Sequence, residues 1–371
     1  MLDYYTFSLK TENMTNFTPY QLKNILHKAL GSLKAFEQCA LLDYPNYPNI
    51  GDHLIWLGEV FYLTDVLKAK INYATSADNF SEIQMEKRIG KSPILLQGGG
   101  NLGDIWDKHQ NFREYIISRY QDRQIIILPQ TIYFADPSNL IKTATIFNAH
   151  PNLTLFVRDN YSYEIALQYF RNCQVFNVPD MAFQMAGMPG LSFNYHRKHP
   201  ILYHCRDDKE YNPLFSPKSI NIPNLVIEDW NFQKNNMRDS KNFDSKWKGF
   251  QEETTITTEW ISRQIWKCFH PYSSKFYNFY DPFLHLRSWM YMHRGIYQFH
   301  QYRLIITNRL HGHILCVLMG IPHIFLPNSY HKNEAFYNTW TYSIPFCKFV
   351  KDSSKIKIVA EELLNFSSEL N

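Results

Sequence analysis

The chain has 371 residues, of which 45% are hydrophobic and 19% are charged. This composition is that of a globular protein, and the length exceeds what a single core usually holds, so two domains are expected. The formal net charge of +4 is spread along the chain without a run of Lys and Arg, which gives no support to a nucleic-acid partner.

The compartment is predicted from the N-terminus, the apolar segments and the cysteines. The first 20 residues lack the basic-then-apolar pattern of a secretory signal, and no apolar stretch is long enough to span a bilayer. We therefore expect a cytoplasmic protein without a transmembrane segment, with association with the inner membrane face left open. The cysteines are far apart, which favours reduced core thiols and no zinc site. They are Cys39, Cys173, Cys205, Cys268, Cys316 and Cys347.

The first half of the chain alternates short apolar segments with helical ones, which predicts a parallel sheet with right-handed crossovers. Each predicted strand ends abruptly in polar residues, Gly or Pro. Those ends should gather at one edge of the sheet, where ligand sites form in such folds. The predicted strands are 39–42, 70–74, 93–96, 124–128, 153–157 and 173–176. The predicted helices are 20–33, 53–67, 112–120, 140–149 and 162–170.

A second series of elements follows a probable linker near residue 192, so we expect an N-terminal domain of residues 1–191 and a C-terminal domain of residues 192–371. Residues 206–256 show little periodicity, which favours long loops. The helix near the C-terminus could cross back to the first domain. The predicted strands are 200–203, 304–306 and 324–326, and the predicted helices are 259–268, 283–298, 314–319, 333–339 and 354–366.

Four polar residues lie in the turn between the strand at 304–306 and the helix that follows it. They are Asn308, Arg309, His311 and His313. A helix N-terminus favours an anion, Arg309 adds a planar fork suited to carboxylate or phosphate, and His311 can carry a proton near neutral pH. The alternative is a helix cap with two surface histidines. We favour that alternative for His313 and a functional role for Arg309 and His311.

The glycines Gly98 to Gly100 permit either a tight turn or a close approach of the backbone to a ligand. They form neither the Gly-x-Gly-x-x-Gly fingerprint of dinucleotide sites nor a P-loop. No nucleotide cofactor is expected from this stretch.

Several short motifs at strand ends, taken together and in order, resemble the polysaccharide pyruvyl transferase family from Cys39 to Asn328. The motifs are Asn49-Ile-Gly-Asp-His53, Gly98-Gly-Gly-Asn-Leu-Gly-Asp104, Trp106-Asp-Lys-His-Gln110, Leu128-Pro-Gln-Thr131, Arg158-Asp159, Pro179-Asp180 and Asn308-Arg-Leu-His311. The resemblance implies a glycosyltransferase B-like architecture, with two Rossmann-like domains facing across a cleft. It also implies transfer of a pyruvyl group from phosphoenolpyruvate to two hydroxyls of a sugar, forming a cyclic ketal in exopolysaccharide or cell-surface glycan biosynthesis.

The resemblance implies catalytic roles for His311 and His109 and binding of the donor by Arg158 and Arg309. Arginine forks suit the two anionic groups of phosphoenolpyruvate, and histidines suit its proton transfers. This chemistry requires neither a metal nor an organic cofactor, so none is expected. Further contacts with substrate are expected from Asn101, Asp104, Gln130, Asp180 and Asp52.

Each of these residues also has a structural interpretation. His109 could be a surface histidine, and Arg158 could form a salt bridge with Asp159 or Asp180. Capping is the first interpretation of Asp52, and Asn101 and Asp104 could cap the next helix. Trp230, Trp247 and Trp260 could form a platform for a saccharide, or could simply be packed.

The expected partners are phosphoenolpyruvate and a sugar acceptor, either a lipid-linked or a free oligosaccharide. Two other functions stay open at this point. One is a glycosyltransferase of the same architecture that uses a nucleotide-sugar donor. The other is a sugar-binding protein without catalytic activity.

Overall fold

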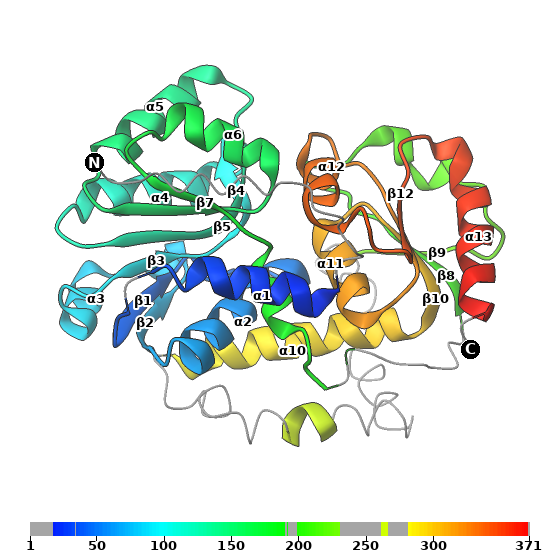
Figure 1. Cartoon of the computed structure of the whole chain (residues 1–371), viewed down its shortest axis with the longest axis horizontal. Helices are drawn as coiled ribbons and strands as arrows, with labels where there is room; N and C mark the ends of the chain where they lie inside the picture. Colours follow the sequence, from blue (N-terminus) through cyan, green and yellow to red (C-terminus); the bar gives the residue numbers. More distant parts are fainter. Residues whose placement is uncertain are drawn as a thin grey trace.

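The strands form two separate sheets in which every pairing is parallel. The predicted α/β class with parallel sheets is therefore confirmed. Figure 1 shows the sheets side by side with helices packed around them. The structure is a computed structural model, and it describes residues 18–33, 35–189, 191, 199–230, 261–265 and 281–369.

The first sheet has the order β2-β1-β3-β5-β6-β7, and β4 also pairs with β5. Its central strands are continuous apolar runs because helices cover both faces of the sheet. The strands are β1 (Gln38–Leu42), β2 (Lys70–Thr75), β3 (Ile94–Leu96), β4 (Gly99–Gly103), β5 (Ile125–Tyr133), β6 (Leu153–Val157) and β7 (Gln174–Asn177). The helices are α1 (Pro19–Leu30), α2 (Ile50–Phe61), α3 (Glu82–Ile89), α4 (Asp107–Arg119), α5 (Pro137–Ala149) and α6 (Asn160–Tyr169).

Gly99 and Gly100 belong to strand β4 in the structure, so of the two interpretations of the glycine run the tight turn is wrong. Gly99 pairs with Gln130, and Gly103 pairs with Tyr133 on a β5 that is longer than predicted. A Cβ atom on Gly103 would lie 1.6 Å from the carbonyl oxygen of Tyr133, and its φ is 144°, so only glycine fits there. Glycines have low strand propensity, which is why the pattern did not indicate β4.

The second sheet has the order β12-β11-β10-β8-β9. Neither β9 nor β12 was predicted, because each has only three residues and mixed polarity. Of the helix expected at 259–268, residues 261–265 are described, and they are helical. The strands are β8 (His199–His204), β9 (Val226–Glu228), β10 (Tyr302–Thr307), β11 (His323–Phe325) and β12 (Cys347–Phe349). The helices are α10 (Pro282–His300), α11 (Leu310–Met319), α12 (Lys332–Phe336) and α13 (Ile356–Glu369).

Helix α10 connects the two halves of the chain. It comes from the second half but lies along α2 of the first (Figure 1), where His53 Nδ1 lies 2.9 Å from Ser288 Oγ and Trp56 Nε1 donates to His285 Nδ1 at 3.2 Å. The terminal helix α13, for which a crossing back to the first domain was left open, packs on the second sheet. The sequence predicted the helix at 283–298, which is α10, but did not show that it packs on the first half of the chain.

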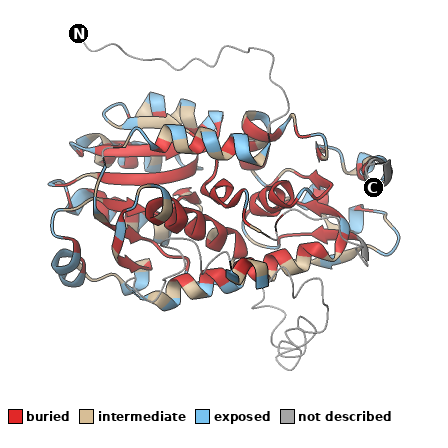
Figure 2. Ribbon diagram, turned by 60° about the horizontal axis from the view of Figure 1, so that its bottom comes forward, coloured by how far each residue is buried: buried red, intermediate tan, exposed pale blue. Residues whose placement is uncertain are grey.

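One apolar core includes residues from both halves of the chain. Buried side chains of α2, α10 and α11 belong to the same cluster, for example Trp56, Trp289 and Leu315. α2 and α11 are buried almost all around, whereas α10 is buried on one side only, as the burial colours of Figure 2 show. Burial of this kind stabilises by about 25 cal/mol per Å² of apolar surface removed from water, so the two sheets are held together by helix packing. Within the described residues, no helix combines the length and hydropathy that a membrane span requires.

A glycine on α10 should be essential for this packing. A Cβ atom on Gly295 would lie 2.9 Å from Ile50 Cγ2 and 3.5 Å from Leu315 Cδ2, so α10 meets both α2 and α11 at this point. Gly295→Leu is expected to lower the free energy of unfolding in urea by at least about 1–3 kcal/mol because it overpacks the contact.

The matched control is Met290→Leu on the same helix, where the side chain is 53% exposed. It should change stability by less than about 0.5 kcal/mol. Equal effects of the two substitutions would contradict the role given to α10.

Candidate active site

A cavity of about 360 Å³ lies between the two halves of the chain, where strand ends of both sheets and the first turns of α2 and α11 meet. Six of the nine predicted site residues line it. They are Asp52, Asn101, His109, Arg158, Arg309 and His311. Gln130 and Asp180 do not line the cavity but contact residues that do, and Asp104 lies elsewhere.

His311 lies in the first turn of α11 and contacts both halves of the chain. A Cβ atom on Gly51 of α2 would lie 2.6 Å from His311 Nδ1, so the lack of a side chain there lets the imidazole pack on the start of α2. On its other side, His311 Nε2 lies 3.3 Å from Asp180 Oδ2. The ring is therefore fixed between a helix N-terminus and a carboxylate.

Asp180 links His311 to Arg158. Its Oδ2 atom also accepts a hydrogen bond from Arg158 Nη1, and both side chains of this ion pair are almost fully buried. Burial disfavours the charged carboxylate, but the charges of His311 and Arg158 together hold the pKa of Asp180 well below its usual value. The structural interpretation of Arg158, a salt bridge with Asp180, thus holds together with a position in the cavity wall.

Arg158 directs one edge of its guanidinium group toward the backbone of β4. Its Nε donates to Thr131 Oγ1 at 3.0 Å, and its Nη1 is used by Asp180. A Cβ atom on Gly100 would lie 3.1 Å from Arg158 Nη2 and 3.4 Å from Lys332 Nζ. Two basic groups therefore converge beside a residue without a side chain, and that arrangement suits a small anion.

Lys332 is a site residue that the sequence did not indicate. It begins α12, far from the recognisable motifs, and is buried beside Glu210, to which its ammonium group is paired. Burial lowers the pKa of Lys332 to about 8, although the Glu210 carboxylate acts in the opposite direction. No local pattern marks this lysine, because only the tertiary fold brings it to Gly100.

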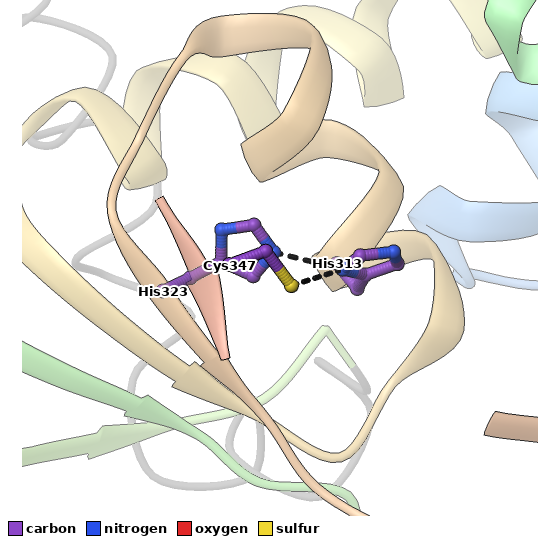
Figure 3. A group of neighbouring side chains, drawn as sticks. All are labelled: His313, His323 and Cys347. Carbon is purple, nitrogen blue, oxygen red and sulfur yellow. Dashed lines mark hydrogen bonds between the residues drawn. The ribbon is translucent and has the colours of Figure 1, made fainter. Parts of the chain in front are cut away.

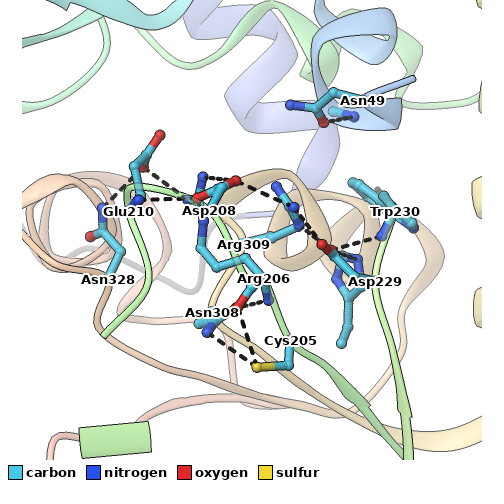
Figure 4. A network of polar contacts seen from close by, with 12 residues as sticks. Asn49, Cys205, Arg206, Asp208, Glu210, Asp229, Trp230, Asn308, Arg309 and Asn328 are labelled. Atoms are coloured by element: carbon cyan, nitrogen blue, oxygen red, sulfur yellow. Dashed lines mark hydrogen bonds and ion pairs between the residues drawn. The ribbon is translucent and has the colours of Figure 1, made fainter. Parts of the chain in front are cut away.

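Arg309 lies in the cavity wall, but its fork is already occupied. Its Nε and Nη2 atoms both donate to the carboxylate of Asp229, the second at 2.7 Å, and Asp208 Oδ2 lies 3.5 Å from Nη2 (Figure 4). Arg206 holds Asp208 in turn. The fork that was expected to bind the donor is thus paired with Asp229 in the structure. Asp229 directly follows β9, a strand that the sequence did not reveal.

His109 lies in the first turns of α4 and is held by a carboxylate. Its Nδ1 lies 2.8 Å from Oδ1 of Asp43, a buried residue that follows β1 with a φ of 71°. Only 14% of the His109 side chain is exposed, so it is not the surface histidine of the alternative interpretation. With Nδ1 donating to Asp43, Nε2 remains for proton exchange. The only sequence feature that could have indicated this role of Asp43 is its place as an acidic residue directly after the first strand.

Two residues predicted to contact substrate, Asn101 and Gln130, are hydrogen-bonded to each other. Asn101 Oδ1 accepts from Arg113 Nη2 at 2.6 Å and from Gln130 Nε2 at 3.0 Å. Gln130 is fully buried and also donates to the carbonyl oxygen of Gln97. Gln130 therefore fixes the orientation of Asn101, which itself lines the cavity.

Two predicted aspartates differ in what they do. The carboxylate of Asp104 accepts from the backbone N–H groups of Ala135 and Asp136, both at 2.8 Å, so it ties down the start of α5 and does not line the cavity. Asp52 is not the cap of α2. Asn49 is, because its side chain accepts from the backbone N–H of Gly51, which leaves Asp52 at the cavity wall.

Of the tryptophans considered as a saccharide platform, Trp230 lines the cavity but is also firmly packed. Its side chain is 1% exposed, stacks on Phe299 with the ring centroids 5.4 Å apart and donates to Gln298. Trp247 and Trp260 lie outside the described residues. His313, interpreted as a surface histidine, is instead fully buried, because α11 is packed on all its sides.

Comparison with known proteins identifies the family. The model of the family "Polysaccharide pyruvyl transferase" matches residues 49–330, so this chain belongs to the polysaccharide pyruvyl transferase family, as its motifs indicated. The chain is 28% identical over 341 residues to the Bacillus subtilis protein named "Putative pyruvyl transferase EpsO", covering 90% of this chain and 95% of that protein. It is 27% identical over 319 residues to "Pyruvyl transferase 1" of Schizosaccharomyces pombe, covering 82% of this chain and 70% of that protein.

A solved structure supports the fold alone. The crystal structure of an uncharacterized protein from Klebsiella pneumoniae aligns with a TM-score of 0.52 at 19% sequence identity. The alignment covers 91% of this chain and 100% of that chain.

The buried link at Asp180 generates a prediction about stability. Asp180→Asn should lower the free energy of unfolding at pH 7 by roughly 3–5 kcal/mol, because it leaves Arg158 buried without its counterion. A folded-state pKa below the unfolded value gives stability that is present above about pH 4 and lost as pH falls. The difference between the two proteins should therefore shrink by about 1–2 kcal/mol between pH 5 and pH 2.5 in urea titrations.

The control for this experiment is Asp78→Asn, which breaks an exposed ion pair with Lys108. Its effect should stay below about 1 kcal/mol. A wild-type minus Asp180→Asn difference that did not vary with pH would contradict the ionised, buried state of Asp180.

Proposed function

We propose that the protein transfers a pyruvyl group from phosphoenolpyruvate to two hydroxyls of one sugar, forming a cyclic ketal and releasing inorganic phosphate. The context would be the biosynthesis of an exopolysaccharide or another cell-surface glycan. The observation that carries this proposal is the shared carboxylate of Asp180. It couples Arg158, which faces the gap at Gly100, to His311, which can transfer a proton.

The donor is assigned to the gap beside Gly100. Arg158 Nη2 and Lys332 Nζ would bind one anionic group of phosphoenolpyruvate there. Charge-assisted bonds of this kind are short and strong, and the anion would share Lys332 with Glu210, its present partner. Arg309 would contribute positive charge at the cavity wall from a position fixed by Asp229.

The chemistry needs one acid and one base, and the two histidines supply them. His311 would donate a proton to the methylene carbon of phosphoenolpyruvate while the first sugar oxygen bonds to C2. His109, held by Asp43, would take the proton of that hydroxyl. The second hydroxyl then bonds to C2 as the bond from C2 to the phosphate oxygen breaks. Its proton restores His311, and the proton on His109 leaves with phosphate.

The acceptor is assigned to the His109 side of the cavity. Tyr47 and Trp106 line that side. The rings of Tyr47 and His109 meet edge to face, with their centroids 5.8 Å apart. Aromatic faces suit the apolar faces of sugar rings. Asp52, held by Tyr47 and Asn49, would accept hydrogen bonds from sugar hydroxyls, and Asn101 also lines the cavity.

The placement of the cavity between two parallel sheets supports a glycosyltransferase B-like arrangement of two Rossmann-like domains. We propose a division near residue 192, in the segment between β7 and β8. The acceptor would be a lipid-linked or free oligosaccharide met on the cytoplasmic side of the membrane.

The function is tested by supplying alternative donors. The full-length chain is incubated with oligosaccharide acceptors and either phosphoenolpyruvate or nucleotide sugars. Phosphate release together with the mass increment of one pyruvyl ketal on the acceptor is the expected result. Nucleotide release would instead identify a glycosyltransferase, and binding of sugar without turnover of any donor would identify a binding protein.

The two histidines should affect turnover more than donor affinity. His311→Gln and His109→Gln are each expected to lower kcat about a hundred- to ten-thousand-fold, the usual contribution of a general acid or base. The Kd for phosphoenolpyruvate should change much less, because Arg158 and Lys332 remain. Single-turnover kinetics and calorimetry measure the two quantities.

The matched control is His27→Gln on α1, where the ring contacts Gln184 far from the cavity. It should leave both quantities near their wild-type values. A His311→Gln protein that retained wild-type turnover would refute the proposed proton donor.

The pKa of Lys332 predicts how donor binding depends on pH. A lysine with a pKa of about 8 is charged below that pH and loses its charge above it. Affinity for phosphoenolpyruvate should therefore be level between pH 7 and the pKa, then fall toward pH 9.5 by up to about tenfold per pH unit. Lys332→Gln should bind more weakly at pH 7 and show no such fall. An identical decline in both proteins would exclude Lys332 from the donor site.

A further inference from the structure

A second group of chemically active side chains lies outside the cavity, in the core beside the second sheet. His313 of α11, His323 of β11 and Cys347 of β12 converge there, and none is more than 1% exposed. Figure 3 shows the thiol and both imidazoles pointing toward one another from three different elements. The proposed reaction uses none of these residues.

The separations of the three groups fit the coordination of a metal ion. His313 Nδ1 lies 2.8 Å from His323 Nε2 and 3.6 Å from Cys347 Sγ, and the three donor atoms all lie within 4.8 Å of one another. Tetrahedral zinc, with Zn–N of about 2.05 Å and Zn–S of about 2.3 Å, places N and S about 3.6 Å apart and two N atoms about 3.4 Å apart. The two histidine nitrogens would have to separate by roughly half an ångström.

In both imidazoles the ring nitrogen that faces away from the cluster has a hydrogen-bond partner, as is usual for metal-ligating histidines. His323 Nδ1 donates to the carbonyl oxygen of Ile321 at 2.8 Å, which leaves Nε2 with a lone pair. His313 Nε2 lies 3.0 Å from Thr341 Oγ1, so Nδ1 can face the metal while Nε2–H donates to the hydroxyl. Ligating histidines almost always donate their other ring N–H to such a partner, which fixes the tautomer.

We propose that His313, His323 and Cys347 form a binding site for a thiophilic d10 cation, Zn²⁺ or Cu⁺. Two imidazoles and a thiolate are ligands that both cations accept. On binding, the Cys347 thiol releases its proton to solvent, and the proton of His313 moves from Nδ1 to Nε2. No electron is transferred.

The site would have a structural role close to the candidate active site. The cation would tie α11 to β11 and β12, and His313 is two residues from His311 on the same helix. The ligands are separated in the sequence by ten and by twenty-four residues, at positions 313, 323 and 347. For this reason no compact zinc motif appears in the chain.

The test is metal binding by the full-length protein. Reduced, chelator-treated protein is equilibrated with Zn²⁺, or anaerobically with Cu⁺, then desalted, and bound metal is measured by mass spectrometry. About one ion per chain is expected in at least one arm. The two arms distinguish which cation is preferred. Co²⁺ is used as a spectroscopic probe and should give a thiolate-to-cobalt charge-transfer band.

Two variants locate the site. Cys347→Ser is nearly isosteric, and His323→Gln keeps a polar group in place. Each should weaken binding at least about a hundredfold, since even outer-shell partners contribute ten- to a hundredfold. The band should disappear in Cys347→Ser. Cys39→Ala, at another buried free cysteine in β1, is the control and should bind like wild type.

Two results would overturn the proposal. One is wild-type protein that retains neither cation, in which case the cluster is a hydrogen-bonded histidine pair beside a thiol. The other is Cys347→Ser protein that keeps wild-type affinity and the cobalt band. Neither result depends on enzymatic activity, so failure here is distinguishable from failure of the proposed function.

Discussion

The candidate active site depends on one buried carboxylate. Asp180 contacts Arg158 of the first half of the chain and His311 of the second through the same oxygen atom, Oδ2. Its other oxygen accepts the backbone N–H of Ala182, so the turn that follows β7 fixes its position. A charge in this location is costly to bury unless it is paired, and the pairing couples the halves of the cavity. A change at Asp180 should therefore affect both the binding of an anion and the position of the histidine.

Close packing at small residues gives the cavity its shape. Gly51 lets the imidazole of His311 lie against α2, Gly295 lets α10 meet α2 and α11, and Gly100 lets Arg158 and Lys332 come close to the backbone of β4 at the cavity wall. The basic side chains around this space are each paired with an acid in the described residues, as Lys332 is with Glu210 and Arg309 with Asp229. An incoming anion would thus bind basic groups that are held in position and already paired with carboxylates. Its binding free energy would be the free energy of the ion pairs that it forms minus that of the ion pairs that it replaces. A ligand with two anionic groups forms more new ion pairs than a ligand with one, so it is favoured.

The sequence predicted the strands and helices best where apolar runs are long and buried. β1, β6 and β10 fall close to their predicted ranges because both faces are covered, and the polar residues after them lie in the cavity wall or contact it. The sequence could not show β9 or β12, which are short, nor β4, whose glycines need β5 as a partner. Asp43, Asp229 and Lys332 were missed because only the tertiary fold brings them to the cavity. Cys347 and His313 were treated separately for the same reason, since nothing in their spacing shows that they touch.

The central claim is that the donor anion binds beside Gly100, next to the proton donor. A crystal structure of the chain with phosphoenolpyruvate tests it most directly. We expect one anionic group of the ligand within hydrogen-bonding distance of Arg158 Nη2 and Lys332 Nζ, with the methylene carbon facing His311. A ligand whose carboxylate and phosphate both lie away from Gly100, or whose methylene carbon faces away from His311, would contradict the account.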